Sequence, residues 1–353
     1  MKLRRFLRLG CGLAAGAIVR AEDGEPAPTF TLFSGTVAHT ISRVAAGPST
    51  LVTTYYQIEG AWPFTPRLAL EFEVEGGQVI GNNHAESLSL SLGSAYRLND
   101  LQEYPELFVP NLFLSGRAAG GTVHWKAGRI GLQSSFDDNR VARAKRTKFL
   151  SLPFTRNAAV AFPGKGLGAA LDWTPAPRAT LTAGVGDANA VSTQNGFATL
   201  RGEYFTALEL TLRPRPEPGT AAFRLLAWCS ERQRVHDGGW ALSADAELAP
   251  ATVAFLRLGT GSEHFARVRG FVAGGLAWEK PFGRKMDFAG LALSRGTAVN
   301  GRRIETVAEI VYRWQATPWL ALSPDVQWIR HPAFSRVDDA WAVGLRVALA
   351  HSR

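Results

Sequence analysis

Apolar and polar side chains alternate one by one along much of this chain. In residues 66–75 every second residue from Leu68 to Val74 is apolar, and most of the residues between them are charged. Successive side chains of a β-strand point to opposite faces, so a period of two predicts a strand with one apolar face and one wet face. The chain is therefore expected to fold mainly as strands.

The same pattern recurs to the C-terminus. Leucines alternate with serines at 87–92, where Leu88, Leu90 and Leu92 predict a strand, and with charged or hydroxyl residues at 208–213. Further strands are predicted from alternation at 240–248, 304–315, 320–328 and 341–349. No helical pattern of comparable quality lies between these segments, so the prediction is an all-β fold.

The connections between these segments are alternately short and long, which is typical of an antiparallel meander with two unlike ends. Sixteen to eighteen candidate strands can be counted. Their spacing of about 21 residues suits transmembrane strands of about 9–11 residues with their connections. The sequence thus predicts a transmembrane antiparallel β-barrel of about sixteen strands, with a polar lumen too wide for side chains to fill.

A soluble β-sandwich is the alternative fold, because its strands alternate too. Several tryptophans lie within a few residues of a proline turn, namely Trp62, Trp173, Trp278, Trp314 and Trp319. That position suits an aromatic girdle at one membrane surface, whereas a sandwich would place tryptophans in the middle of its strands. The tryptophans therefore favour the barrel.

Residues 1–21 resemble a cleaved secretory signal peptide. Four basic residues precede the apolar stretch 9–19, and small or β-branched groups surround a cleavage site after Ala21. A targeting helix for an organelle or a retained anchor is the alternative. Cleavage would leave 22–353 as a single barrel domain and lower the formal net charge from +9 to +4.

The composition of the mature chain excludes several function classes. Cys229 would be the only cysteine left, so neither an intramolecular disulfide nor a thiolate metal cluster can form. The basic residues are dispersed along an exported chain, which argues against binding nucleic acid. The histidines are scattered and no motif of a hydrolase, a nucleotide-binding loop or a zinc protease occurs, so we predict no enzyme, cofactor or metal. An outer-membrane lipase with a Ser/His pair at one rim stays an alternative.

Polar residues opposite the apolar face of each strand are expected to line the lumen. The predicted pore-lining residues are Glu71, Glu73, Glu209, Arg213, Asp245, Glu247, Arg267, Arg269, Glu305, Glu309, Arg313, Asp325, Gln327 and Arg346. Carboxylates accept and guanidinium groups donate hydrogen bonds, so this wall suits neutral polyhydroxyl solutes. The plainer interpretation is that these groups only keep the lumen wet.

The longest unpatterned connection is 131–165. It carries five basic residues in nine positions, at Arg140, Arg143, Lys145, Arg146 and Lys148. A connection of this length in a compact fold is usually functional, and it could fold inward and narrow the channel. The alternative is a solvated surface loop that faces lipopolysaccharide phosphates.

Two stretches resemble the carbohydrate-selective porins of the OprB type. The first runs from Glu305 to Arg346 and includes the segments 317–319 and 324–327. The second includes 128–130, Phe136-Asp137-x-Asn139 and Phe149-Leu150. The chain departs from the family pattern at Ser151, where asparagine is usual, and at 350–353, where the usual terminal aromatic is missing.

The resemblance implies a sixteen-stranded outer-membrane barrel through which small sugars diffuse, with arginines and acidic residues at its constriction. It adds Asp137 and Asn139 to the candidate pore residues. The expected function is facilitated diffusion of small carbohydrates, monosaccharides such as glucose among them. The expected location is the outer membrane of a Gram-negative-type envelope, in contact with lipid and lipopolysaccharide, and a homotrimer is compatible with this function. A general or weakly anion-preferring porin and a non-conducting structural or adhesive barrel are the alternatives.

Overall fold

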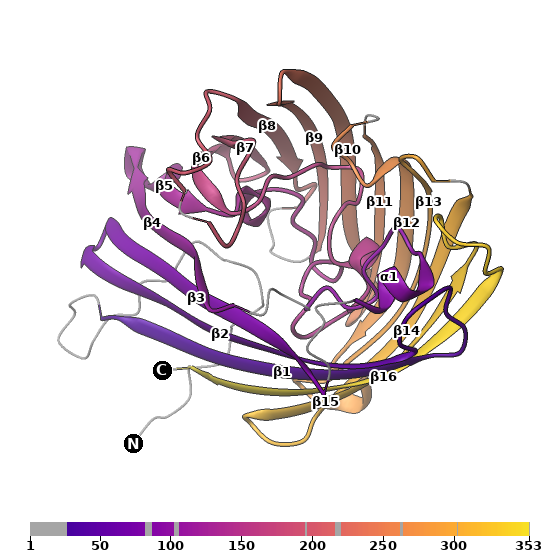
Figure 1. Cartoon of the computed structure of the whole chain (residues 1–353). Helices are drawn as coiled ribbons and strands as arrows, with labels where there is room; N and C mark the ends of the chain where they lie inside the picture. The colour runs from indigo at the N-terminus through magenta and orange to yellow at the C-terminus, as the bar shows by residue number, and fades with distance from the viewer. Residues whose placement is uncertain are drawn as a thin grey trace.

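Sixteen strands form one closed antiparallel barrel. The computed structural model describes residues 27–81, 87–101, 106–194, 196–215, 220–261, 264–301 and 303–352, and the expected signal peptide 1–21 lies outside these ranges. Each strand pairs with its neighbours in sequence, and β1 pairs with β16 to close the sheet (Figure 1). The strands are β1 Thr29–Ile41, β2 Thr50–Thr65, β3 Leu68–Ile80, β4 Phe108–Ala118, β5 Val123–Ile130, β6 Gly166–Ala176, β7 Ala179–Asp187, β8 Tyr204–Leu212, β9 Ala221–Arg232, β10 Val235–Ala249, β11 Thr252–Thr260, β12 Val268–Glu279, β13 Phe288–Ala298, β14 Ile304–Gln315, β15 Leu320–Arg330 and β16 Asp339–Ser352. The predicted antiparallel barrel of about sixteen strands is confirmed.

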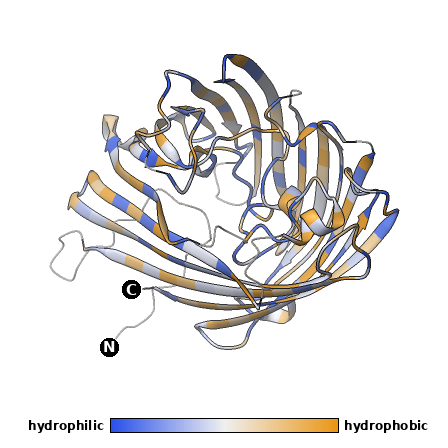
Figure 2. Cartoon of the chain, viewed as in Figure 1, coloured by the Kyte–Doolittle hydropathy of each residue, from blue (hydrophilic) through white to orange (hydrophobic). Residues whose placement is uncertain are grey.

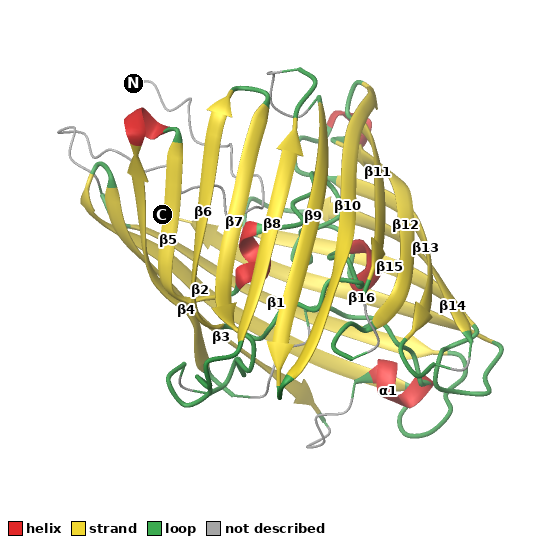
Figure 3. Ribbon diagram, turned by 90° about the horizontal axis from the view of Figure 1, so that it is seen from above, coloured by secondary structure: helices red, strands yellow, loops and turns green. Residues whose placement is uncertain are grey.

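The two ends of the barrel differ, as the connections predicted. At the end where β1 begins and β16 ends, the turns are short, for example 66–67, 177–178 and 250–251. We call this the short-turn end. The connections 81–107 and 131–165 leave from the opposite end, the long-loop end, where the helix α1 (Leu88–Leu92) also lies (Figure 3). In outer-membrane barrels the short turns face the periplasm, and the longer loops face outward.

The strands are apolar on the outside of the barrel. In β13 the outward Leu291 and Leu293 are 53% and 54% exposed, whereas Ala292 and Ser294 between them are 1% exposed. The same alternation gives the banded colouring of the strands in Figure 2. Large exposed tryptophans lie near the short-turn end, as predicted, at Trp62, Trp173, Trp278, Trp314 and Trp319. A second aromatic group, which includes the paired Trp328 and Trp341, lies toward the long-loop end. Two such belts are typical of a membrane-spanning barrel.

The core of the molecule lies inside the barrel, where the two longest connections fold inward (Figure 1). Tyr96 of one connection and Phe149 of the other are fully buried in a single cluster with Phe255 and Phe271 of the wall. Phe149 packs edge-on against Phe288 at a centroid distance of 5.7 Å. The wall and the inward connections therefore share one hydrophobic core.

The strand predicted at 87–92 is wrong, because this segment is the short helix α1. The Ser87 hydroxyl accepts a hydrogen bond from the Leu90 amide at 3.4 Å, and Gly93 ends the helix with a positive φ of 75°. Serine and glycine are the residues favoured at these two caps. The helix buries Leu88 and Leu92 one turn apart and leaves Leu90 exposed. None of the described helices has the length and hydropathy needed to cross a bilayer.

Candidate functional site

The connection 131–165 enters the lumen beside β7. The Phe136 ring packs against Gly184 of β7. A Cβ atom at position 184 would lie 2.8 Å from this ring, so the absence of a side chain there makes room for Phe136. Asp137 follows with a φ of 52°, a backbone conformation that Asp tolerates better than most residues. This turn aims the connection across the lumen.

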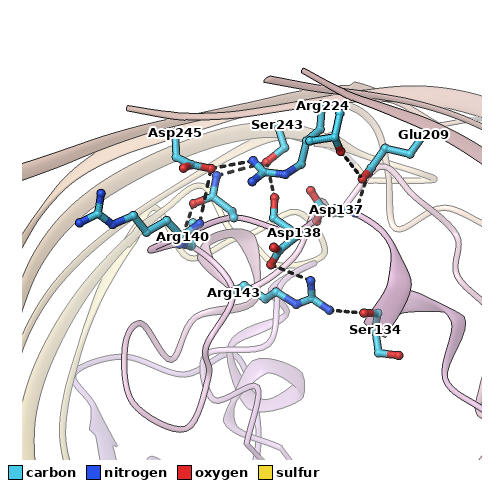
Figure 4. Close-up of polar contacts among 12 residues, drawn as sticks. Ser134, Asp137, Asp138, Arg140, Arg143, Glu209, Arg224, Ser243 and Asp245 are labelled. Atoms are coloured by element: carbon cyan, nitrogen blue, oxygen red, sulfur yellow. Dashed lines mark hydrogen bonds and ion pairs between the residues drawn. The ribbon is translucent and has the colours of Figure 1, made fainter. Parts of the chain in front are cut away.

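Asp137 is the buried centre of the first contact with the wall (Figure 4). Its amide donates to a Glu209 carboxylate oxygen at 2.8 Å, and its own carboxylate accepts from the Asn157 amide at 2.7 Å. The Arg257 guanidinium lies 3.2 Å from the other Asp137 oxygen. Burial raises the pKa of Asp137, against the lowering effect of the Arg257 charge. Through its backbone amide and its carboxylate, Asp137 thus joins both limbs of the connection to β8 and β11.

The next contacts of the connection are with β10. The Asn139 amide group donates to the Ser243 hydroxyl at 3.2 Å and to the Ala244 carbonyl at 3.1 Å. Asp245, on the same inner face, forms a buried ion pair with Arg224 at 2.6 Å (Figure 4). Buried charges in proteins require such partners, since an unpaired one is costly.

Four of the five basic residues of the segment 140–148 form ion pairs with carboxylates of the described residues. Arg140 pairs with Glu247 at 2.8 Å and with Glu279 at 2.7 Å, and Lys148 lies 3.3 Å from Glu279. These contacts tie the segment to β10 and β12. The alternative of a fully solvated surface loop is wrong, because most of these side chains are enclosed by the barrel wall.

The same segment also reaches the opposite wall and its own preceding turn. Arg146 lies 3.3 Å from Glu59 of β2. Arg143 pairs with Asp138 at 2.8 Å and donates to the Ser134 carbonyl at 2.6 Å (Figure 4). The connection therefore spans the lumen from β2 to β12.

Glu309 and Arg346 hold the middle part of this connection, residues 145–151. The Glu309 carboxylate accepts from the Leu150 amide at 2.7 Å and from the Ser151 amide at 2.9 Å. The Arg346 guanidinium donates to the carbonyls of Lys145 and Lys148 at 2.8 and 2.9 Å. Two wall side chains on β14 and β16 thus fix the backbone of 145–151.

Glu305 performs the same role for two other connections. Its carboxylate accepts from the amides of Ala95 and Ala333, each at 2.9 Å, and from the Ser94 hydroxyl. Gln327 of β15 donates to the Leu98 carbonyl at 2.8 Å. One strand, β14, therefore anchors three inward connections through Glu305 and Glu309.

Asp325 has a different partner, the buried His39 of β1. The His39 ring reaches Asp325 across β16, where Gly344 leaves room for it. Asp325 also accepts from the Gln327 side chain at 3.0 Å. This buried contact links three successive strands next to the seam of the barrel.

Fourteen of the sixteen predicted site residues lie inside the barrel. These are Glu71, Glu73, Asp137, Asn139, Glu209, Arg213, Asp245, Glu247, Glu305, Glu309, Arg313, Asp325, Gln327 and Arg346. The parity of the strands therefore assigned the correct face to twelve of them, and the family resemblance supplied Asp137 and Asn139. Several, such as Glu309 and Arg346, are nevertheless fully buried beneath the inward connections. They contact those connections in place of open water.

The prediction is wrong for Arg267 and Arg269. Arg267 lies in the connection before β12, and Arg269 is exposed at a bulge in that strand, where the register shifts between Val268 and Gly270. Val268 takes the inward position and is fully buried. A bulge adds one residue to a strand and so reverses the parity on which the prediction depended.

The lumen keeps a cavity of about 350 Å³ between the short-turn end and the inward connection. Its charged lining consists of six basic and four acidic side chains: Arg67, Arg117, Lys126, Arg143, Arg213, Arg224, Glu71, Asp138, Asp172 and Glu209. Lys126 donates to the Ser134 hydroxyl at 2.9 Å, and Asp172 accepts from the Thr182 hydroxyl at 2.7 Å. We call this the lumen cavity.

The sequence prediction missed Arg67, Arg117, Lys126, Asp138, Asp172 and Arg224 as cavity residues, and it named Arg143 only as part of the basic loop that could narrow the channel. Asp172 shares the inner face of β6 with Ala170, and Arg224 shares that of β9 with Leu226, so strand parity could have found both. Asp138 and Arg143 belong to the connection, and no periodic signal indicates how a connection folds.

The chain matches known porins in sequence and in fold. The profile described as "Carbohydrate-selective porin, OprB family" matches residues 68–236 and 230–350. Porin AaxA of Chlamydia abortus is 25% identical over 264 residues, which cover 71% of this chain and 58% of that protein. Porin AaxA of Chlamydia caviae is 25% identical over 265 residues, with the same coverage. This chain thus spans less than two thirds of the length of these relatives.

Solved structures share the barrel. The high-pH structure of Pseudomonas putida OprB superposes with a TM-score of 0.76 at 14% identity, covering 92% of this chain and 94% of that one. A mutant porin of Rh. blastica superposes with a TM-score of 0.55 at 9% identity, covering 92% of this chain and all of that one. At these identities the likeness concerns the fold alone. The family profile matches well over half of the residues of this chain, so the chain belongs to the OprB family of carbohydrate-selective porins.

Proposed function

We propose that this chain lets small carbohydrates, monosaccharides such as glucose among them, diffuse passively across the outer membrane through its lumen. The observation that carries the proposal is the lumen cavity, which the inward connection 131–165 closes off on one side. Its volume of about 350 Å³ lies in the range of small-molecule sites. Membership of a carbohydrate-selective family supports the same substrate class.

The charge pattern of the cavity suits a neutral, polyhydroxyl solute. Arg143 and Asp138 of the inward connection offer donors and acceptors side by side, and they form an ion pair at 2.8 Å. Such a pair can exchange hydrogen bonds with hydroxyl groups without fixing a strong preference for one ion. Arg140 and Arg146 of the basic segment 140–148 have wall carboxylates as partners, which reduces the net positive charge that the segment brings to the lumen.

A weak preference for anions is the second candidate. It is favoured by the excess of six basic over four acidic side chains around the lumen cavity. Rings of charge in a pore bias the ions that pass, even where neutral solutes pass too. An anion preference would thus accompany sugar passage, or replace it if the cavity does not bind sugar.

The proposal includes a location and a route of export. The barrel would lie in the outer membrane of a Gram-negative-type envelope after cleavage of residues 1–21, without enzymatic activity and with no cofactor. Assembly of three such barrels is compatible with the proposal. N-terminal sequencing of the purified protein would test the cleavage of residues 1–21, and its mass in detergent would test the assembly of three barrels.

Single-channel recording of the purified protein in a planar bilayer tests the function. Glucose, a disaccharide and a neutral non-sugar of matched size are titrated separately, and the reversal potential is measured under a salt gradient. Saturable block by sugar alone is the expected result. Open channels with strong anion preference and no sugar block would contradict the sugar proposal. Silence from a correctly folded barrel would favour a structural or adhesive barrel.

A further inference from the structure

Hydroxyl and carboxylate side chains cover the inner face of β6, β7 and β8, three strands that lie side by side in the wall (Figure 3). They form two rows across the strands, because residues in register on neighbouring strands point to the same face. The second row is nearer the short-turn end, and five of the six side chains line the lumen cavity. We call these residues the polar rows: Asp172, Thr182 and Glu209 in the first, and Thr174, Thr180 and Thr211 in the second.

The polar rows keep hydrogen-bonding capacity for a solute. The Thr182 hydroxyl donates to the Asp172 carboxylate at 2.7 Å, and the hydroxyl oxygens of Thr174 and Thr180 are 3.1 Å apart. A carboxylate has about four acceptor sites, and a hydroxyl accepts as well as donates, so these contacts do not saturate the groups. The hydroxyl groups of a sugar, which also donate and accept, can use the positions that are left.

Arg213 lies at the short-turn edge of the second row. It directly follows β8, lines the lumen cavity, and donates from its guanidinium to the Thr180 hydroxyl at 3.2 Å. No carboxylate among the described residues forms an ion pair with it, in contrast to Arg143 and Arg224 of the same cavity. A guanidinium group with only a neutral partner can bind an incoming carboxylate through two parallel N–H···O bonds.

The spacing between Arg213 and the first row fits one monosaccharide. Thr180 and Thr182 are two residues apart on β7, so the two rows are separated by about 6.6 Å. Thr180 contacts the Arg213 guanidinium, and Thr182 contacts Asp172. A pyranose ring with a carboxylate attached is of comparable length. One such molecule can therefore place its carboxylate at Arg213 and its distant hydroxyl groups at Asp172.

We propose that the polar rows and Arg213 form a subsite for acidic monosaccharides, sugars that carry one carboxylate. This inference rests on the proposed function and extends the solutes that pass from neutral sugars to sugar acids. The sugar hydroxyl groups exchange hydrogen bonds with the polar rows, and the carboxylate pairs with Arg213. A neutral sugar can use only the rows, and a simple anion can use only the guanidinium group. Arg213 therefore determines the preference for sugar acids.

The test is block of single channels in a planar bilayer by glucuronate, glucose and acetate, titrated separately at the same ionic strength. In the unchanged barrel we expect half-block by glucuronate at about one tenth of the glucose concentration, and no block by acetate. Arg213→Gln should bring the ratio of the two sugars to about one, and Arg213→Lys, which keeps the charge but loses the planar pair of donors, should keep part of it. Arg178→Gln is the matched control, because Arg178 lies in the adjoining turn, outside the cavity, where its carbonyl accepts from the Arg213 amide. This variant should keep the tenfold ratio.

Each outcome decides the proposal. A tenfold ratio that survives Arg213→Gln would overturn it, and so would acetate block at the concentration at which glucuronate blocks. Loss of the ratio in Arg178→Gln would overturn it too, since the preference would then come from the overall charge of the short-turn end. Equal block by glucose and glucuronate in the unchanged barrel would refute this subsite and leave the proposed function standing, whereas absence of block by either sugar would refute both.

Discussion

Removing the Glu309 carboxylate should release the segment 145–151 from the wall and widen the channel. In Glu309→Ala the amides of Leu150 and Ser151 lose the acceptors that lie at 2.7 and 2.9 Å. A buried amide left without a partner costs about 1–3 kcal/mol. Taking the lower value for each of the two amides gives an expected loss of about 2 kcal/mol. The open population of the segment should then rise about 30-fold.

Two readouts follow this opening. Single-channel conductance should increase, and trypsin should cleave faster after the basic residues of the segment 143–148. Glu309→Gln keeps one acceptor and should give about half of the free-energy change. Thr306→Ala, on the outer face of the same strand, is the matched control and should behave like the unchanged protein.

The reasoning would be refuted if Glu309→Ala kept both the conductance and the trypsin resistance of the unchanged barrel. In that case the packing of Phe149 against Phe154 and Phe288 would hold the segment, and the carboxylate would be dispensable.

Three further predictions concern the membrane face, the lumen cavity and pH. Leu345→Arg, on the outer face, should cost about 2–4 kcal/mol near mid-bilayer and impair insertion, measured as the fraction of folded barrel in lipid vesicles; normal insertion would contradict the assigned face. Arg143→Ala should weaken sugar block about tenfold and shift the reversal potential toward cations, whereas Arg178→Ala should leave both unchanged. Burial alone would raise the pKa of Asp100, but the charge of Arg156 and of other basic neighbours outweighs it and lowers the pKa from 3.8 to about 2. The ionised pair of Asp100 with Arg156, 2.6 Å apart, therefore stabilises the inward connections fully above about pH 4 and is lost as the pH falls toward 2. Pepsin cleaves at these pH values, and Asp100→Asn should remove the pH step from the pepsin sensitivity of the barrel.

Strand parity predicted the barrel well, because each strand has one face in lipid and the other inside. This physical contrast is strong wherever pairing is regular, as in β14, where Glu305 and Glu309 face inward as expected. It fails at Arg269, where a bulge changes the register, and at Leu88 and Leu92, where a capped helical turn imitates a period of two.

The candidate site was less predictable than the wall. The sequence could assign Glu309 and Arg346 to the lumen, but it could not show that backbone groups of 145–151 would occupy their hydrogen-bonding positions. The Glu309–Leu150 and Arg346–Lys148 contacts join residues that are 159 and 198 positions apart in the chain. The fold of the connection also depends on wall positions that have no side chain, such as Gly184. The sequence does not show that Gly184 makes room for Phe136, because the two residues meet only in the folded barrel.

The shared core of wall and connections has a consequence for any attempt to enlarge the pore. Val253, Phe255 and Phe271 face the interior and are covered by Phe149 and its neighbours. If the connection 131–165 were deleted, these apolar side chains would border the water column. A hydrophobic stretch of channel excludes water and so blocks ions, even when it is wide enough to pass them. Deletion of the whole connection should therefore give a drier and less stable channel, whereas loosening a single anchor should give a more conductive one.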